Sequence, residues 1–172
     1  LTVVTGASGF IGQALVNELS TRRIHYRAVV RTASSLLDGF TSQSNVFPIG
    51  EIGTETDWTK ALINCDCVIH CAGRAHFMNG SSAAFHNVYR SNNLDGTKQL
   101  ANQASQLGVR RLVFLSSIKV DGESTDDRES PFGYSNERII HPPSDFYALS
   151  KWEAEQSLWE ISAKTGLEVV VI

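Results

Sequence analysis

The sequence predicts one doubly wound α/β domain over residues 1–172, in which a parallel sheet is covered on both faces by helices. Strand-like and helix-like runs alternate along the chain, which is the pattern of such a sheet. A glycine-rich turn also joins the first expected strand to the first expected helix. This fold, the Rossmann fold, has the strand order 3-2-1-4-5-6 and binds ligands where that order reverses, at the carboxyl ends of the strands.

The expected strands are short runs of mainly apolar residues, and the expected helices carry apolar residues at spacings of three and four. We expect strands at residues 1–5, 25–31, 45–49, 66–71, 111–115 and 167–172, and helices at residues 10–22, 56–63, 83–107 and 146–165. The stretch 116–145 shows little periodicity. Loops of that length in a compact domain are usually functional.

Composition excludes several classes of function. A net charge of −3 over 172 residues and the lack of a basic tract argue against binding to nucleic acid. No apolar run approaches the ~18 residues of a membrane span, and no signal peptide precedes the first strand. Cys65, Cys67 and Cys71 lack the spacing of a metal site, so we interpret them as small buried residues in a reducing cytoplasm. We expect a cytoplasmic protein without a metal site.

Residues 5–12 form the candidate dinucleotide site. Gly6 allows a tight turn out of the strand, Gly9 lets the backbone approach a pyrophosphate, and Gly12 permits close packing of helix on sheet. The helix N-terminus then points its free N–H groups at the phosphates. A purely structural turn is the alternative. Three further residues complete the candidate cofactor-binding set of this turn: Ser8, Phe10 and Ile11.

Arg31 ends the second expected strand, where a site that prefers NAD usually places an acid on the adenosine ribose. A guanidinium at this position can pair with the 2′-phosphate of NADP. The sequence therefore favours NADP over NAD, with a solvated surface arginine as the alternative.

Tyr147 and Lys151 lie four residues apart at the start of an expected helix, and therefore on one face of it. A nearby ammonium favours the phenolate and suits the phenol to general acid–base catalysis, while the lysine could also hold ribose hydroxyls. Ser116 and Ser117 end the fifth strand, where a hydroxyl can hydrogen-bond a substrate oxygen. Alternatively, Tyr147 and Lys151 are an ordinary pair on the surface, and the two serines only form a turn at the strand end.

Five motifs together resemble those of the extended short-chain dehydrogenase/reductases, over essentially the whole chain. They are Gly6/Gly9/Gly12, His70-Cys71-Ala72-Gly73, Asn93-Leu94-Asp95-Gly96-Thr97, Ser116-Ser117 and Tyr147/Lys151. The chain resembles in particular the NAD-dependent epimerase/dehydratase family. Residues 74–78 and 117–120 are similar to its nucleotide-sugar epimerase and 4-ketoreductase branch, especially reductases of UDP-4-keto-6-deoxy-hexosamines.

The resemblance implies a catalytic set. Tyr147 would be the acid/base, Lys151 its activating and ribose-holding partner, and Ser117 the donor to the substrate oxygen. Asn93 matches the asparagine that bends its helix and helps a proton relay, although Asn92 could equally be the match.

The resemblance also implies further contacts with the cofactor. Ala72 and Gly73, with Cys71 before them, would line it. Glu51, with Ile52 after it, would approach the adenine, unless Glu51 is an ordinary loop acid.

The implied reaction is hydride transfer at the 4-keto or 4-hydroxy carbon of a nucleotide sugar. Arg31 favours a 4-ketoreductase that exchanges NADPH in each turnover, and the alternative is a UDP-sugar 4-epimerase with bound NAD. A reductase of non-sugar ketones and a non-catalytic NADP-binding scaffold on the same fold also stay open. The triplet Ser117-Ile118-Lys119 lacks the two acids that dehydratases of the family carry, which disfavours dehydration.

The resemblance implies a substrate domain after the sixth strand, and we expect these residues to stop before it. The chain starts without methionine and ends on an apolar run, so we expect a piece cut at both ends that has no turnover alone. His76, Met78 and Lys119 are weaker candidates for substrate contact. The helices 146–165 and 83–107 carry apolar residues around much of their girth, including Trp152 and Trp159. The resemblance implies that these two helices form the interface of a homodimer, and packing of the same residues against the sheet is the alternative.

Overall fold

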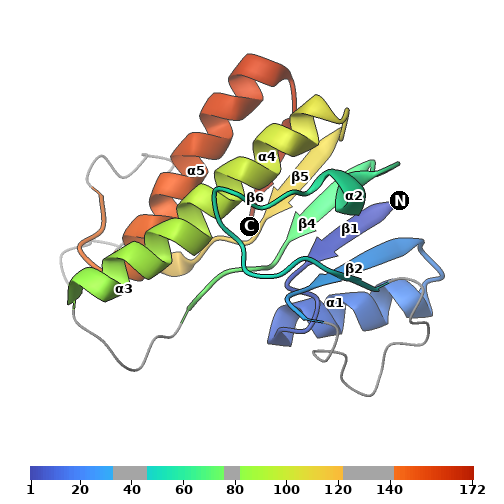
Figure 1. Cartoon of the computed structure of the whole chain (residues 1–172), viewed down its shortest axis with the longest axis horizontal. Coiled ribbons are helices and arrows are strands. Elements are labelled where there is room, and N and C mark those ends of the chain that lie inside the picture. The colour runs from blue at the N-terminus through green and yellow to red at the C-terminus, as the bar shows by residue number, and fades with distance from the viewer. Residues whose placement is uncertain (33–45, 76–81, 122–141) are drawn as a thin grey trace, which may run out of the picture.

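Six parallel strands form the centre of the protein in the order β3-β2-β1-β4-β5-β6, as predicted (Figure 1). The computed structural model describes residues 1–32, 46–75, 82–121 and 142–172. The strands are β1 (Thr2–Thr5), β2 (Tyr26–Val30), β3 (Val46–Pro48), β4 (Cys67–His70), β5 (Arg111–Phe114) and β6 (Glu168–Val171). Each lies within its predicted range, because short runs of apolar residues bounded by turns fit a buried parallel strand.

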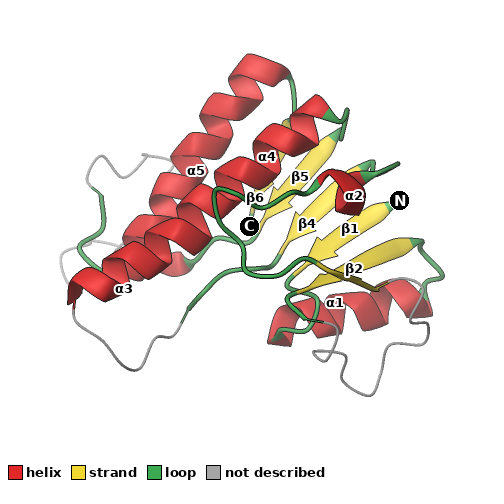
Figure 2. Cartoon of the chain, in the orientation of Figure 1, coloured by secondary structure: helices red, strands yellow, loops and turns green. Residues whose placement is uncertain are grey.

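Helices pack on the two faces of the sheet in unequal numbers (Figure 2). The helix α1 (Phe10–Thr21) lies on β1 and β2, where Val16 and Leu19 join the buried side chains of Val4 and Val30. The other face carries α2 (Thr59–Leu62), α4 (Gly96–Gln106) and α5 (Phe146–Thr165). The larger part of the core lies under these three helices.

The face that carries α1 is only partly covered. Ile69, Val113 and Val170 continue the row of Val4 across β4, β5 and β6. They are half-buried or exposed, and no helix among the described residues lies over them. The prediction of helices on both faces is therefore confirmed, with α1 on one face and α2, α4 and α5 on the other.

The predicted helix 83–107 is a continuous run with one wide turn inside it. α3 (Ser82–Tyr89) is followed by a π-helical turn over Arg90–Asp95 and then by α4. In the wide turn the N–H of Gly96 donates to the carbonyl of Ser91, five residues earlier. A turn with this bond spacing inserts one residue into the helix, and such turns are frequent at functional sites. Here it buries Asn93.

The helix α5 begins and ends as predicted because both of its ends are capped. The carboxylate of Asp145 accepts a hydrogen bond from the N–H of Ala148 at 2.8 Å. At the other end, Gly166 adopts the left-handed conformation, with φ of 79°, which favours glycine.

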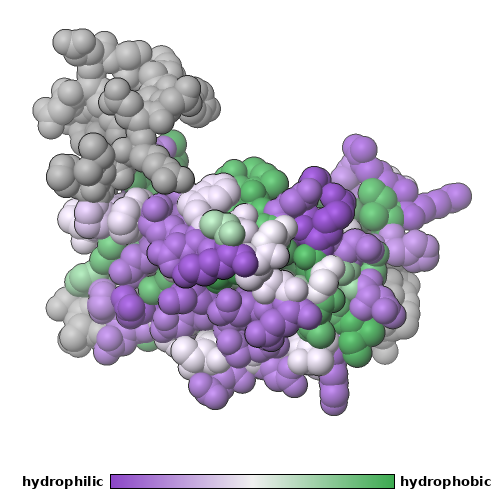
Figure 3. Space-filling view, turned by 90° about the horizontal axis from the view of Figure 1, so that it is seen from above, coloured by the Kyte–Doolittle hydropathy of each residue, from purple (hydrophilic) through white to green (hydrophobic). Residues whose placement is uncertain are grey.

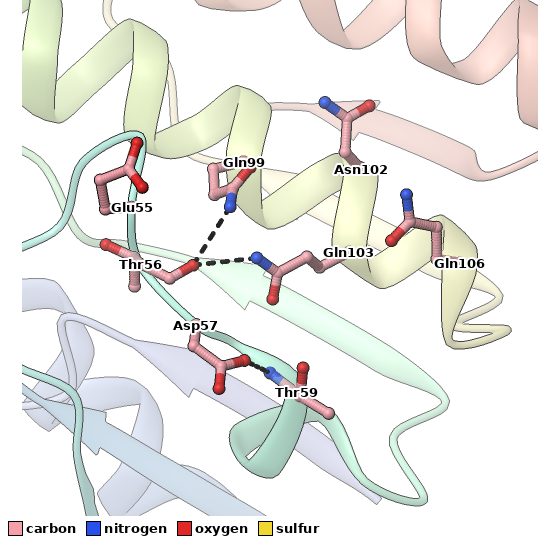
Figure 4. A pocket seen from close by; sticks show the side chains of 8 residues that line it. All are labelled: Glu55, Thr56, Asp57, Thr59, Gln99, Asn102, Gln103 and Gln106. Atoms are coloured by element: carbon pink, nitrogen blue, oxygen red, sulfur yellow. Dashed lines mark hydrogen bonds between the residues drawn. The ribbon is translucent and has the colours of Figure 1, made fainter.

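The helix α2 is shorter than the predicted helix 56–63, because α4 binds the residues before it (Figure 4). Gln103 accepts from the N–H of Trp58 at 2.7 Å and donates to the carbonyl of Thr56 at 2.9 Å. These bonds tie the backbone just before α2 to α4. The shallow depression here is lined only by polar residues, namely Glu55, Thr56, Asp57, Thr59, Gln99, Asn102, Gln103 and Gln106.

The surface agrees with the composition. Figure 3 shows a face that is mainly hydrophilic, with hydrophobic residues in separate patches. None of the helices in the described part of the chain has the length and apolar character needed to cross a membrane.

Candidate functional site

A cavity of about 250 Å³ lies at the carboxyl ends of β1, β2, β3 and β4, where the strand order reverses. Nine of the residues predicted to bind a cofactor line it: Gly6, Ser8, Gly9, Arg31, Glu51, Ile52, Cys71, Ala72 and Gly73. The structure thus brings together segments that lie up to about 65 residues apart in the sequence. This is the place at which open α/β sheets bind their ligands.

The glycine turn has the shape that a diphosphate needs. Gly6 has φ of +63°, and a Cβ there would lie 2.7 Å from the Cα and N of Ala72. A Cβ on Gly12 would collide with the carbonyl oxygen of Gly6. Gly9 is the N-cap of α1, and no side chain caps that helix end. Its first N–H groups are therefore free of side-chain acceptors and fit a pyrophosphate.

Phe10 and Ile11 do not line the cavity. Their side chains are 94% and 52% exposed on the first turn of α1. Both side chains are open to solvent, and their contact with a cofactor stays a prediction.

Three charged side chains lie together at the β2 and β3 side of the cavity. Glu51 accepts a hydrogen bond from Arg31 Nη1 at 3.2 Å and another from Arg74 Nη2 at 3.1 Å. Partial burial alone would raise the pKa of Glu51, but the hydrogen bonds and charges of Arg74 and Arg31 hold it below its ordinary value. Arg31 is thus at the predicted position, paired with a carboxylate.

Lys151 reaches the cavity edge from α5. Its Nζ donates to the carbonyl of Leu115 at 2.7 Å and lies 4.4 Å from the ring centroid of Phe114. A Cβ on Gly73 would lie 3.4 Å from Nζ, so the ammonium lies directly beside a cavity-lining residue. Burial lowers the pKa of Lys151 to about 8, against the opposing effect of Cys71 and Glu155.

Asn93 lies at the centre of a hydrogen-bond chain. Its amide accepts from the N–H of Arg74 at 2.8 Å and donates to the Arg74 carbonyl at 3.0 Å and to Ser150 Oγ at 3.0 Å. Ser150 Oγ in turn donates to the carbonyl of Tyr147 at 2.7 Å. These hydrogen bonds connect the loop after β4 to the first turn of α5. Asn92, the alternative match, lines the cavity instead and donates to the carbonyl of Val88.

The side chains of Tyr147 and Ser117 make no hydrogen bond to the other predicted catalytic residues within the described part of the chain. The ring of Tyr147 packs edge-on against Tyr89 at 5.9 Å between centroids. Ser117 Oγ accepts from the N–H of Lys119 at 3.3 Å, at the start of a 3₁₀ turn over Ile118–Asp121. No hydrogen bond between the described residues joins Ser117 to Tyr147, and their cooperation on a substrate stays a prediction.

Other predictions have mixed outcomes. His76 and Met78 lie outside the described residues, and Lys119 is exposed.

The three cysteines are free. Cys65 is buried as predicted, whereas Cys67 and Cys71 are only half-buried, because Cys67 lies on the uncovered face of β4 and Cys71 borders the cavity. Burial raises the pKa of the Cys71 thiol to about 11, which leaves it a poor nucleophile at neutral pH.

Sequence reasoning missed five residues that line the cavity, Val29, Val30, Ile49, Gly50 and Arg74, and named Asn92 only as the alternative match to Asn93. Val30, Gly50 and Arg74 adjoin predicted site residues in sequence, and Val29 and Ile49 lie among the last three residues of predicted strands. The rule that strand ends form the site could have found them. The ion pair of Arg74 had no sequence signal.

His70 forms a buried polar connection behind the cavity. Its Nδ1 lies 2.6 Å from Thr5 Oγ1, and its Nε2 lies 3.0 Å from Thr97 Oγ1. Thr5 Oγ1 also accepts from the N–H of Ala72 at 3.2 Å. His70 therefore ties β4 to α4 and, through Thr5, to the strand before the glycine turn. Burial, and secondarily the charge of Lys151, lower its pKa to about 3, so the ring is neutral.

We expect the free energy of unfolding to fall as the pH drops below about 6.5. The unfolded ring of His70 takes up a proton there and the folded ring does not, so the unfolded state gains up to about 1.4 kcal/mol per pH unit. Urea unfolding at pH 6.5 and pH 5 checks this. His70→Asn should lose much of the decline, while His25→Asn, at an exposed histidine, should retain it. An equal decline in both variants would contradict the assignment to His70.

Comparisons with known proteins show the family of this chain. A family model described as "NAD dependent epimerase/dehydratase family" matches residues 2–172. A UDP-glucose 4-epimerase of Vibrio cholerae is 39% identical over 171 residues, which are 99% of this chain and 49% of that protein. Cinnamoyl-CoA reductase 1 of Oryza sativa subsp. japonica is 29% identical over 100% of this chain and 52% of its own length.

Solved structures share the fold. The structure described as "MoeE5 in complex with UDP-glucose and NAD" has a TM-score of 0.75 and 27% identity, and the match covers 99% of this chain and 52% of that one. The chain thus spans about half the length of the proteins it matches. The family model, which matches nearly every residue, shows that the chain belongs to the NAD dependent epimerase/dehydratase family of short-chain dehydrogenase/reductases.

Proposed function

We propose that the protein transfers hydride at C4 of a nucleotide sugar, with the reduction of a 4-keto group as the physiological direction. The observation that carries this proposal is the position of Lys151 Nζ beside Gly73, which lines the cavity at the carboxyl ends of β1 to β4. The Vibrio cholerae epimerase and the MoeE5 complex support a UDP-sugar as the substrate class. When bound, the nicotinamide ring would supply or accept the hydride.

Each of the four predicted catalytic residues then has a distinct role. The hydroxyl of Tyr147 gives its proton to the substrate O4 as the carbonyl becomes an alcohol, and takes it back in the reverse direction. The ammonium of Lys151 favours the resulting phenolate and can donate to ribose hydroxyls. Ser117 Oγ–H donates to the same substrate oxygen. Asn93 positions the tyrosine through Ser150, since Ser150 holds the backbone of Tyr147.

The cofactor end of the cavity supports a reductase. Arg31 and Arg74 supply two guanidinium groups where a 2′-phosphate would lie. Net reduction consumes one NADPH in each turnover, so it needs a nucleotide that dissociates and is replaced from solution. The 39% identical relative named as a UDP-glucose 4-epimerase favours a second candidate, a 4-epimerase with retained NAD.

One assay separates these two functions. The whole protein is incubated with UDP-glucose without added nucleotide, and separately with a UDP-4-keto-6-deoxy-hexosamine and NADPH. We expect oxidation of NADPH in the second reaction and no UDP-galactose in the first. UDP-galactose formed without added nucleotide would establish the epimerase and exclude the reductase. Inactivity in both, with turnover of an apolar ketone, would exclude a nucleotide-sugar substrate.

We also propose a homodimer formed through α4 and α5. Trp159 is 36% exposed on α5, and Trp152 is half-buried on the same helix. Most other apolar residues of the two helices, such as Leu100 and Leu158, lie in the core. The surface available for a dimer is therefore narrower than the sequence predicted. Sedimentation of the whole protein as a monomer at micromolar concentration would contradict this proposal.

A further inference from the structure

The charged cluster of the cavity consists of one carboxylate between two guanidinium groups from different strand ends. Arg31 follows β2, Glu51 follows β3 and Arg74 follows β4, and all three line the cavity. Each arginine bonds a different oxygen of Glu51, at 3.2 and 3.1 Å. The carboxylate thus occupies the position between the arginines that an anionic ligand would take.

The two nicotinamide dinucleotides differ chemically at one group, the adenosine 2′ substituent. In NADP it is a phosphate, which needs guanidinium donors and is repelled by a carboxylate. In NAD it is a hydroxyl, which can donate to a carboxylate. The cluster offers both kinds of partner, so the charge state and pairing of Glu51 affect the two dinucleotides in opposite directions.

We propose that Glu51 determines the choice between NADP and NAD, as an internal anion that a 2′-phosphate must displace from Arg31 and Arg74. Arg74 is then a second ligand for the phosphate, in addition to Arg31. This inference rests on the proposed dinucleotide site and deepens it. It also explains how an arginine typical of NADP sites can occur in a family that is named for NAD.

The test measures dissociation constants of NADP and NAD by calorimetry, with 2′,5′-ADP and 5′-ADP as fragments that lack the nicotinamide. Glu51→Gln should tighten NADP and 2′,5′-ADP binding about tenfold and weaken NAD binding a fewfold. Arg74→Met should weaken NADP and 2′,5′-ADP binding about tenfold and leave NAD within about threefold. Added salt should reduce both effects.

The controls change the net charge equally at ion pairs outside the cavity. Glu18→Gln removes the partner of Arg22, and Arg90→Met removes the partner of Glu153. If Glu51→Gln changes the NADP to NAD ratio no more than Glu18→Gln does, Glu51 does not set the choice. If Arg74→Met weakens NADP no more than Arg90→Met does, Arg74 is not a ligand. Binding of neither dinucleotide to the unaltered protein would instead overturn the proposed function.

Discussion

Tyr147→Phe is expected to lower kcat for reduction of the sugar ketone by about 10²- to 10⁴-fold, with the nucleotide dissociation constant unchanged. The substitution removes only the hydroxyl. The ring can still pack edge-on against Tyr89, and Ser150 still binds the backbone carbonyl of residue 147. Steady-state kinetics on the whole protein, together with a nucleotide titration, measure the two quantities separately.

The matched control for this substitution is Tyr26→Phe. Tyr26 shares a hydrogen bond with Ser20 on the opposite side of the sheet, where its hydroxyl lies 2.9 Å from Ser20 Oγ. Its loss should leave kcat within about twofold, since the net contribution of such a bond is about 1 kcal/mol to stability and none to the proton transfer. A kcat of Tyr147→Phe within fivefold of the unaltered protein would remove Tyr147 as the proton donor.

Gly12→Ala is expected to destabilise the fold by about 3 kcal/mol or more and to abolish nucleotide binding. A Cβ at this position meets backbone atoms, the carbonyl oxygen of Gly6 and the Cα of Ala7, which cannot rotate away. Overpacking against backbone forces α1 away from β1 and thereby distorts the turn. Urea unfolding followed by circular dichroism measures the loss of stability.

Gly9→Ala is expected to reduce nucleotide affinity while leaving the stability of the fold nearly unchanged. Gly9 has φ of −79°, which alanine adopts easily, and its Cβ would lie 3.2 Å from the Gly6 carbonyl oxygen. Stability should change by less than about 1 kcal/mol, while NADP affinity falls more than about tenfold because the methyl group obstructs the pyrophosphate.

A control for glycine substitution in general is Gly108→Ala. Gly108 has φ of +74° with open space around it, so the change should cost about 1 kcal/mol of backbone strain and leave binding intact. Equal nucleotide affinity in Gly9→Ala and the unaltered protein would place the diphosphate elsewhere.

The regular parts of the fold could be predicted because their signals are local. The β2 and β5 strands were predicted from runs of apolar residues, and the predicted helix 146–165 matches α5, whose ends the structure shows capped by Asp145 and Gly166. The start of α2 could not be found in this way. Its position depends on Gln103, which lies more than 40 residues away and bonds the backbone of Trp58.

The candidate site also contains residues that local sequence spacing predicts and residues that only the tertiary structure brings together. The glycine turn and the Tyr147/Lys151 pair have fixed spacings, so the sequence was enough to name them. The pairing of Arg74 with Glu51 requires the loop after β3 to meet the loop after β4, although β2 and β1 separate these two strands in the sheet. Arg31 was interpreted as a free cation for a phosphate. The structure shows it paired with Glu51, so its strength as a phosphate ligand depends on that carboxylate.

The wide turn over Arg90–Asp95 also constrains how this helix can vary. One residue advances an ordinary α-helix by about 100°, so removing a residue here would rotate everything downstream by more than a quarter of a revolution. Leu100 and Ala104 would then turn away from the sheet and lose their core contacts, while Tyr89 stayed in place. Homologous chains that keep both the amide relay and the sheet contacts must therefore preserve the residue count between Tyr89 and Leu100, even where the identities of those residues drift.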